Sequence, residues 1–218
     1  YGVYDKSSLT RRTSILLGAI GTSKDLDDLS SLLERMESPI KGAADDHKSN
    51  LFPDFCGFSK SAGFYAELIF NQDLGRQLRQ MDIEKVAKIK DRTDRLEQAI
   101  NLYYEEIKFL AQNRPVDVIV CVLSKSIFDA VSKDEVVEGE EKLEESIEVQ
   151  SELNFRRALK AKAMHLGKPL QLLRADSLVS GGKGQQDDAT KAWNLATALY
   201  YKAGATNPWR LEKAEGNS

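Results

Sequence analysis

The sequence has few of the residues that build metal centres, disulfide frameworks and nucleophilic active sites. Its 218 residues include only two cysteines and two histidines. Cys56 and Cys121 lie far apart and outside any CxxC or Cys/His pattern, which indicates reduced thiols and a cytoplasmic compartment. His47 and His165 fall on different expected elements. The sequence therefore predicts no catalytic residues of the Ser/His/Asp or Cys/His kind and no protein-held metal.

Long hydrophobic runs and nucleotide-binding fingerprints are also missing. No run of 18 apolar residues occurs, and the N-terminus lacks the basic and then apolar pattern of a signal peptide, so we expect no membrane partner and no secretion. The dinucleotide motif GxGxxG is absent, and a P-loop cannot be drawn through the Gly-rich stretch 180–186. The chain begins with Tyr1 instead of Met, and we expect a fragment or a processed form.

Charge is distributed unevenly along the chain. The net charge of −3 argues against a polycation that binds nucleic acid indiscriminately. Residues 134–148 contain eight acids and one base, whereas residues 156–210 contain ten bases and three acids. Any anion-binding site is therefore expected in the last third of the chain.

Apolar runs alternate with stretches of helical periodicity, which predicts an α/β fold with a Rossmann-like, mostly parallel sheet flanked by helices. The expected strands are 14–20, 64–70, 116–123 and 170–173. The expected helices lie between a Thr22 or Ser23 N-cap and Pro39, and at 82–113, 154–167 and 187–203. Residues 135–150 are expected to form a solvated insertion or a frayed helix start.

Two cations and one amide stand out in the last third. Arg156 and Lys160 are four residues apart and share one face of a helix. Gln171 interrupts a short apolar strand, so its buried amide needs a partner. Together these groups suit a phosphate or a nucleotide. Lys202 lies in the last turn of the final helix, where the helix dipole or a ligand explains it equally well.

These residues resemble the MID domain of prokaryotic Argonautes running into their PIWI domain. The resemblance rests on the pattern Arg156-x3-Lys160-x10-Gln171, on Lys202 within YYKAG, and on the following PWRL at 208–211. It covers most of the chain in element order, but its specific motifs lie in the last 65 or so residues. It implies a MID-like domain at 1–205, and the start of a PIWI-like segment or an added tail at 206–218.

The resemblance implies a role for each matched position. Lys160, Gln171 and Lys202 would bind the 5′-phosphate of a small guide RNA or DNA, with Gln171 donating through its amide NH2. Arg156, at a position that is often aromatic in the family, would lay its guanidinium plane against the first base. A loop of Ser124, Lys125, Ser126 and Ile127, at the carboxyl end of a strand, would sense the identity of that base.

Further partners follow from the same resemblance. The PIWI domain would complete the protein. A Mg2+ ion, held largely by the phosphates of the guide, would bridge those phosphates. The RNase H-like catalytic half of a slicing Argonaute is not within these residues, so the expectation is a binding module for prokaryotic defence and not an enzyme. Two alternatives stay open. One is a Rossmann-like enzyme that uses a nucleotide or a phosphorylated metabolite. The other is an interaction scaffold whose acidic segment, 135–148, contacts a partner protein.

Overall fold

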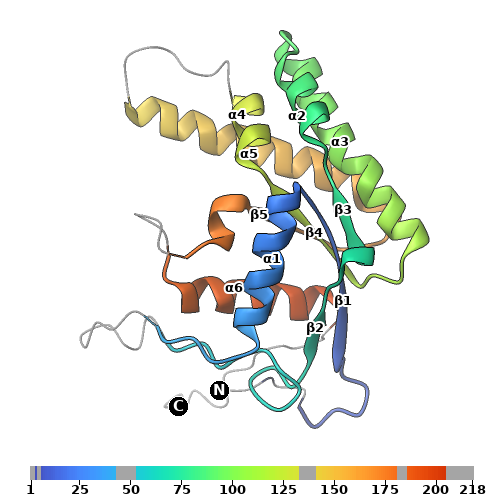
Figure 1. The fold of residues 1–218 in the computed structure, drawn as a ribbon, viewed down its shortest axis with the longest axis vertical. Helices are drawn as coiled ribbons and strands as arrows, with labels where there is room; N and C mark the ends of the chain where they lie inside the picture. The colour runs from blue at the N-terminus through green and yellow to red at the C-terminus, as the bar shows by residue number, and fades with distance from the viewer. Residues whose placement is uncertain (1–2, 4–5, 43–52, 133–140, 181–185, 205–218) are drawn as a thin grey trace, which may run out of the picture.

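The chain forms a five-stranded parallel sheet between two layers of helices, as Figure 1 shows. This computed structural model describes all residues except 1–2, 4–5, 43–52, 133–140, 181–185 and 205–218, and the side chains of 141–151 are also outside the description. His47 and the PWRL segment therefore lie outside the described residues. The predicted Rossmann-like α/β fold is confirmed.

The sheet is built around two adjacent strands, the largely buried β1 (Ser14–Gly21) and the fully buried β4 (Val118–Leu123). β5 (Leu170–Arg174) pairs with β4 and forms one edge of the sheet. Two short strands, β2 (Glu67–Ile69) and β3 (Gly75–Gln77), pair in turn with the other side of β1. The strand predicted at 64–70 is thus too long, because the left-handed backbone of Gly63 and Tyr65 delays the start of β2 to Glu67. A 3-10 turn at Gln72–Leu74 then separates β2 from β3.

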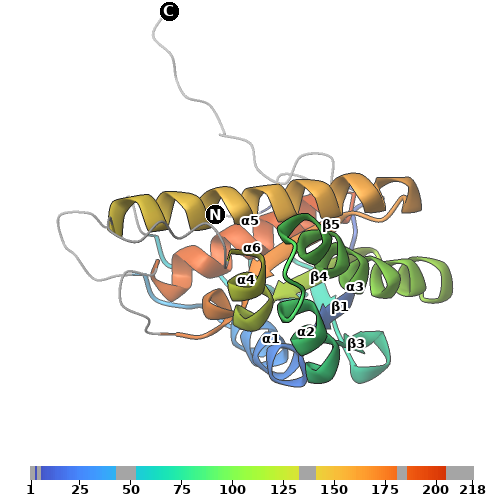
Figure 2. The ribbon, with the colours of Figure 1, turned by 90° about the horizontal axis from the view of Figure 1, so that it is seen from above.

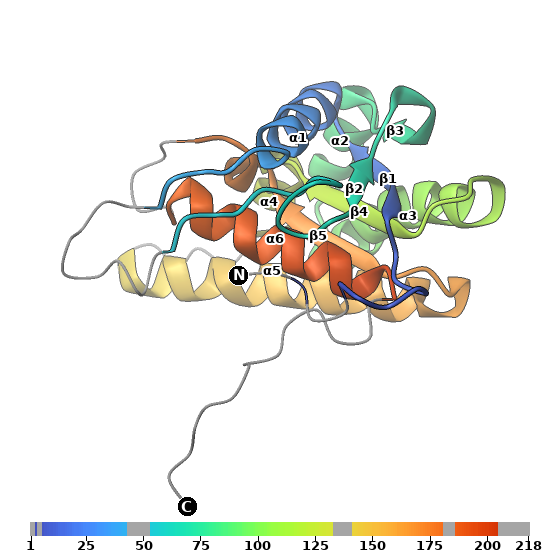
Figure 3. The ribbon, with the colours of Figure 1, turned by 90° about the horizontal axis from the view of Figure 1, so that it is seen from below.

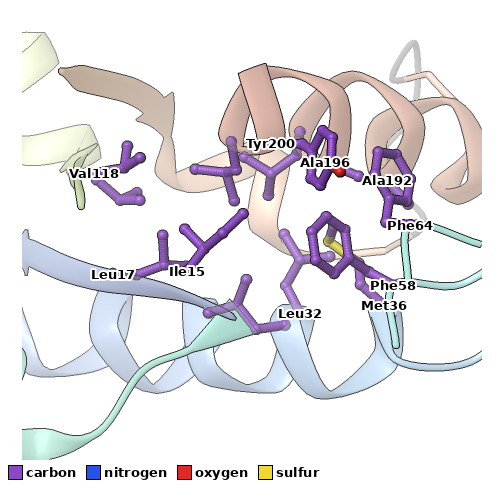
Figure 4. Close-up of a cluster of buried hydrophobic side chains, with 14 of the residues drawn as sticks. Ile15, Leu17, Leu32, Met36, Phe58, Phe64, Val118, Ala192, Ala196 and Tyr200 are labelled. Carbon is purple, nitrogen blue, oxygen red and sulfur yellow. The ribbon is translucent and has the colours of Figure 1, made fainter. Parts of the chain in front are cut away.

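Helices cover both faces of the sheet, as Figures 1 and 2 show. One face carries α1 (Ser23–Met36) and α6 (Asp188–Lys202). The other carries α2 (Gln80–Ala87), α3 (Arg92–Asn113), α4 (Lys125–Ser132) and α5 (Glu141–Ala163). Successive side chains of β4 point to opposite faces of the sheet and so contribute to the hydrophobic core on each face. Val118 and Val120 face α1 and α6, whereas Ile119 and Cys121 face the opposite layer of helices. Figure 4 shows Val118 in the first of these cores with Ala192, Ala196 and Tyr200 of α6.

The prediction of one continuous helix at 82–113 was wrong, because the segment forms two helices. α2 ends at Ala87, and α3 begins after Asp91, whose side chain accepts a hydrogen bond from the backbone N–H of Asp94 at 2.9 Å. An N-cap aspartate of this kind starts a new helix. Further along, residues 141–150 are the first part of α5, so a helix start describes this stretch better than an insertion.

Thr22, and not Ser23, caps α1, and the turn after β1 is a structural one. The Thr22 side chain accepts a hydrogen bond from the backbone N–H of Asp25 at 3.3 Å. The Asp25 carboxylate in turn accepts from the backbone N–H and the hydroxyl of Thr22, at 2.9 and 2.7 Å. This capping box engages the backbone N–H groups of Thr22 and Asp25, two of the donors that a phosphate-binding turn would offer.

A buried arginine joins the helices of the second layer. Arg95 on α3 is only 2% exposed. Its guanidinium donates to the carbonyl of Ala130 in α4 at 2.6 Å and to the carbonyls of Ile89 and Lys90 after α2, at 2.7 and 3.2 Å. The positive charge therefore lies at the carbonyl-rich ends of two helices, where the helix dipole favours it.

Arg95→Leu should lower the free energy of unfolding by about 3 kcal/mol, because one buried and two partly buried carbonyls lose their donor. Urea unfolding followed by circular dichroism measures this. The matched control is Arg92→Leu, an exposed position in the first turn of the same helix, which should change stability by less than about 1 kcal/mol. Equal stability of the two variants would contradict the role given to Arg95.

Candidate functional site

In the described part of the chain, the outer edge of β5 presents backbone carbonyls that no further strand pairs. The carbonyl of Pro169 faces β4, where it accepts from the N–H of Ile119 at 3.0 Å. Because directions alternate along a strand, the carbonyls of Leu170 and Leu172 point away from the sheet. Each of these two accepts from a cationic side chain. We call this row of outward carbonyls and their cations the β5 edge.

Lys202 and Gln171 meet at the β5 edge. The Lys202 ammonium donates to the carbonyl of Leu170 at 2.8 Å and to the side-chain oxygen of Gln171 at 2.5 Å. The side chains of Leu170 and Leu172 pack into the core on the α5 side, so alternation turns Gln171 toward α6, whose last turn carries Lys202. The half-buried amide thus has the partner that the sequence required. Figure 3 shows α5 and α6 running along the β5 side of the sheet.

Lys160 joins this pair through its charge. Burial of Lys202 lowers the pKa of its ammonium below the ordinary value, and the positive charge of Lys160 lowers that pKa further. Lys160 itself is exposed on α5. Within the described residues, neither lysine forms an ion pair with a carboxylate. The charge of Lys160 thus acts unfavourably on the charged form of Lys202, and an anion would relieve this repulsion.

Arg156 lies on the next outward carbonyl of the β5 edge. One of its terminal nitrogens donates to the carbonyl of Leu172 at 3.0 Å, while Nε and the other terminal nitrogen lie 2.5 Å from Oε1 of Glu152. The side chain is 25% exposed. Bonds in the plane of the guanidinium fix its orientation and leave its flat faces free of these partners. The charge of Arg156 is thus balanced by Glu152, in contrast to the charges of Lys160 and Lys202.

Glu152 and Arg174 were missed from the sequence. Glu152 precedes Arg156 by four residues on α5, a spacing that predicts an ion pair and could have found it. Its second oxygen lies 3.7 Å from Arg174, the last residue of β5. The guanidinium of Arg174 lies 4.6 Å from the ring centroid of Phe128 on α4. No sequence pattern joins Phe128 to Arg174, because the two elements meet only in the folded chain.

The predicted base-sensing loop, Ser124 to Ile127, is mostly a helix. Lys125, Ser126 and Ile127 form the first turn of α4, and Ile127 is only 1% exposed, so it cannot contact a base. The Ser124 hydroxyl accepts from the backbone N–H of Ile127 at 3.4 Å, as an N-cap does. The stretch is helical and not a loop because the residues after Ser124 include apolar side chains at helical spacing, which are buried in α4. Lys125 and Ser126 remain exposed at the carboxyl edge of the sheet.

A separate crevice of about 720 Å³ opens where β1 and β4 end. β1 has β2 and β3 on one side and β4 on the other, so the strand order changes direction between β1 and β4. Parallel α/β sheets bind ligands at such a point. The walls offer hydroxyls, amides and two lysines, including those of Thr22, Ser124, Gln77, Lys24 and Lys125. The crevice lies at the carboxyl ends of the strands, whereas Gln171 lies near the start of β5. A ligand in this crevice would be expected if the chain has the alternative, enzymatic function.

The residues that the structure describes do not fit a protein-held metal. No group of three or more His, Cys, Asp or Glu side chains in the described parts could hold a metal ion. A Mg2+ beside Lys160 and Lys202 would meet two positive charges and no carboxylate ligand. His165 instead lies 3.2 Å from the Tyr104 hydroxyl, and both cysteines are free thiols.

No helix among the described residues combines the length and the apolar character needed to cross a lipid bilayer.

Lys160→Met should raise the pKa of Lys202, because it removes the neighbouring charge that lowers it. Burial should still hold the pKa below the ordinary value. NMR titration of 13C-dimethylated lysines measures this directly. The control is Lys162→Met on the same helix, where the ammonium lies over the Tyr104 ring and should leave Lys202 unaffected. An identical Lys202 titration in Lys160→Met would show that the two ammonium groups do not face each other.

No protein-family model matches this chain, and no curated protein matches it significantly. Its function must therefore be inferred from the arrangement of Lys160, Gln171 and Lys202 at the β5 edge.

Proposed function

We propose that the chain is a binding module that anchors the phosphorylated 5′ end of a small guide RNA or DNA, in the manner of the MID domain of a prokaryotic Argonaute. One observation carries the proposal. The half-buried ammonium of Lys202 contacts Gln171, the charge of Lys160 disfavours its protonated form, and the described residues supply neither lysine with a carboxylate partner. Such an arrangement costs free energy in the absence of a ligand, and an anion would offset this cost.

The open hydrogen-bond donors of the site favour a phosphate. Lys202 has three N–H donors, of which the carbonyl of Leu170 and the oxygen of Gln171 take two. Among the described residues, the amide nitrogen of Gln171 makes one long bond, at 3.4 Å to the carbonyl of Leu172. Lys160 adds further donors from α5. Each charge-assisted bond to a phosphate contributes about 1.5–3 kcal/mol.

The charge of the ligand decides which phosphate is preferred. A terminal phosphate carries close to two negative charges at neutral pH, because its second pKa is about 6, whereas an internal diester carries one. Two cations with positioned N–H donors therefore favour the terminal group. In this proposal Arg156 offers a guanidinium face to the first base, since its in-plane donors are held by Glu152 and Leu172.

The remaining parts of the proposal concern partners. The PIWI domain of the same Argonaute would be the main protein partner, and residues 206–218, expected to begin it, lie outside the described residues. A cytoplasmic role in defence against foreign nucleic acid fits such a module. Any Mg2+ would be held by the guide phosphates, because the described residues provide no ligand set. No catalytic residue is assigned.

A 5′-phosphorylated oligonucleotide should bind at least about tenfold tighter than the same oligonucleotide with a 5′-hydroxyl, since one lost charge-assisted bond already costs that much. Lys160→Ala should remove most of this ratio. Fluorescence anisotropy with internally labelled strands measures both affinities. Lys162→Ala, two residues away on another side of α5, is the matched control and should keep the ratio.

Gln171→Glu provides a second variant of the site. It keeps an oxygen acceptor for Lys202, so the fold should be retained, but its negative charge should repel the phosphate and reduce the ratio toward one. Equal affinities of the unsubstituted protein for the two 5′ ends would contradict the proposal.

The crevice at the ends of β1 and β4 favours one alternative, a Rossmann-like enzyme that uses a nucleotide or a phosphorylated metabolite. Its hydroxyls and lysines suit a phosphorylated ligand, although the chain lacks the glycine fingerprints. Thermal-shift screening separates the two functions. Stabilisation by NAD(P), FAD or ATP, without stabilisation by 5′-phosphorylated oligonucleotides, would favour the enzyme.

A further inference from the structure

The side of the sheet opposite β5 ends in an open strand edge. β3 pairs with β1 on one side, and within the described residues no strand lies beyond it. Figures 2 and 3 show β3 at the margin of the molecule, on the other side of β1 from β4 and β5. Neither the lysine pair nor Gln171 takes part in this edge, so the proposed function does not account for it.

The extended backbone of this edge runs from Gly75 to Arg79. Gly75 has φ −90° and ψ 138°, and Arg79, the N-cap of α2, has φ −77° and ψ 134°. The N–H of Leu78 donates to the carbonyl of Gly21 in β1 at 2.8 Å. Since only alternate residues of a parallel strand bond to a given neighbour, the backbone groups of Gly75, Gln77 and Arg79 point away from β1.

Some of these outward groups already have partners within the chain. The N–H of Gly75 donates to the carbonyl of Gln72, and the carbonyl of Arg79 accepts from two N–H groups of α2 at 3.0 and 3.3 Å. The carbonyl of Gly75, both backbone groups of Gln77 and the N–H of Arg79 have no hydrogen-bond partner among the described residues. Two donors and two acceptors are therefore available, and such an edge is a template for another strand.

These available groups match each other across a two-fold axis. If a second copy pairs antiparallel, with Gln77 opposite its own counterpart, the two glutamines exchange both N–H···O bonds. The same register places Arg79 opposite Gly75 of the second copy, because each lies two residues from Gln77. The N–H of Arg79 then donates to the carbonyl of that glycine, and the symmetry repeats this bond. Every available donor thus meets an available acceptor.

Charge along the edge is complementary under the same two-fold axis. Asp73, just before the edge, is exposed and forms no ion pair within the described residues. At the other end, Arg79 and Lys85 share the carboxylate of Asp82, at 2.7 and 3.0 Å, which leaves one positive charge in excess. Antiparallel pairing makes Arg79 a diagonal neighbour of Asp73 in the second copy, within reach of a long side chain. Opposite charges therefore meet at both ends of the pairing.

A hollow lies beside the edge on each face of the sheet. One, of about 770 Å³ between β3, α2 and α3, has Leu78, Val86 and Leu102 among its lining residues. The other, of about 590 Å³ beside α1, has Leu26 and Phe70 in its wall. A second copy joined at the edge would cover these apolar side chains. Their burial adds a hydrophobic contribution to the hydrogen bonds of a short strand.

We infer that two copies of this chain pair antiparallel through Gly75–Arg79 and form a two-fold symmetric dimer with one continuous sheet. The inference does not rest on the proposed function. The two β5 edges lie at the outer ends of the joined sheet, so each stays accessible to its own ligand.

Sedimentation velocity of the full chain tests the dimer. A reversible dimer should appear between about 1 and 300 µM, as expected for a small interface. Gln77→Pro should weaken it by at least about 100-fold, because proline has no N–H for the central bonds. The fold should be retained, since this N–H faces away from β1 and an edge strand tolerates proline there. A chain that stays monomeric at about 300 µM, or a folded Gln77→Pro that still dimerises, would overturn the inference.

Charge variants provide a second test that leaves the backbone unchanged. Asp73→Lys should weaken the dimer about tenfold, because like charges then meet at both ends. Adding Arg79→Glu to this variant should restore the dimer. Glu34→Lys, the same charge change at an exposed position near the end of α1, is the matched control and should have no effect. An unaffected dimer in Asp73→Lys, or no recovery in the double variant, would count against the pairing.

Amide hydrogen exchange followed by NMR identifies the surface that pairs. In dilute protein the N–H groups of Gln77 and Arg79 should exchange rapidly, and at dimer-forming concentrations their exchange should slow by about tenfold or more. The amides of β5 should show no such dependence on concentration. A dimer in which Gln77 remains unprotected, or in which β5 gains the protection instead, would show that the copies meet elsewhere and would overturn the inference.

Discussion

The unpaired edge of β5 is the constraint on which the site depends. An edge strand leaves alternate carbonyls without a neighbour, and buried or half-buried carbonyls need donors. Lys202 supplies one to Leu170, and Arg156 supplies one to Leu172. Each cation comes from a helix on a different face of the sheet. Closing the sheet edge thus gathers positive charge along a single line, where a ligand can reach it.

The two cations of this edge differ in how they are neutralised. Glu152 balances Arg156, whereas Lys202 stands beside Lys160. Because the pKa of Lys202 is lower in the folded chain than in the unfolded one, its charged form destabilises the free protein, and this cost decreases as the pH rises from the lowered value toward the ordinary one. A dianion would raise the pKa again. In the proposed function, this charge balance favours a phosphate beside Lys202.

The sequence predicted the sheet better than its surroundings. Continuous apolar runs marked β1 and β4 because both faces of these strands are buried. Lys202 and Gln171 were also expected to act together, and they are in contact. The Asp91 cap was overlooked because the regular apolar stripe of α3 made the whole segment look like one helix, although α2 ends at Ala87. The contact of Arg174 with Phe128 could not be predicted, since it depends on tertiary packing alone.

In the proposed function, the β5 edge binds a doubly charged strand terminus. The 31P NMR titration of a bound 5′-phosphorylated oligonucleotide tests it most directly, because the terminal phosphate is resolved from the diesters. Two nearby lysines should stabilise the dianion and shift its second pKa clearly below the free value of about 6, while the diester resonances stay nearly unchanged. An unshifted terminal pKa, or equal perturbation of terminal and internal phosphates, would contradict the account.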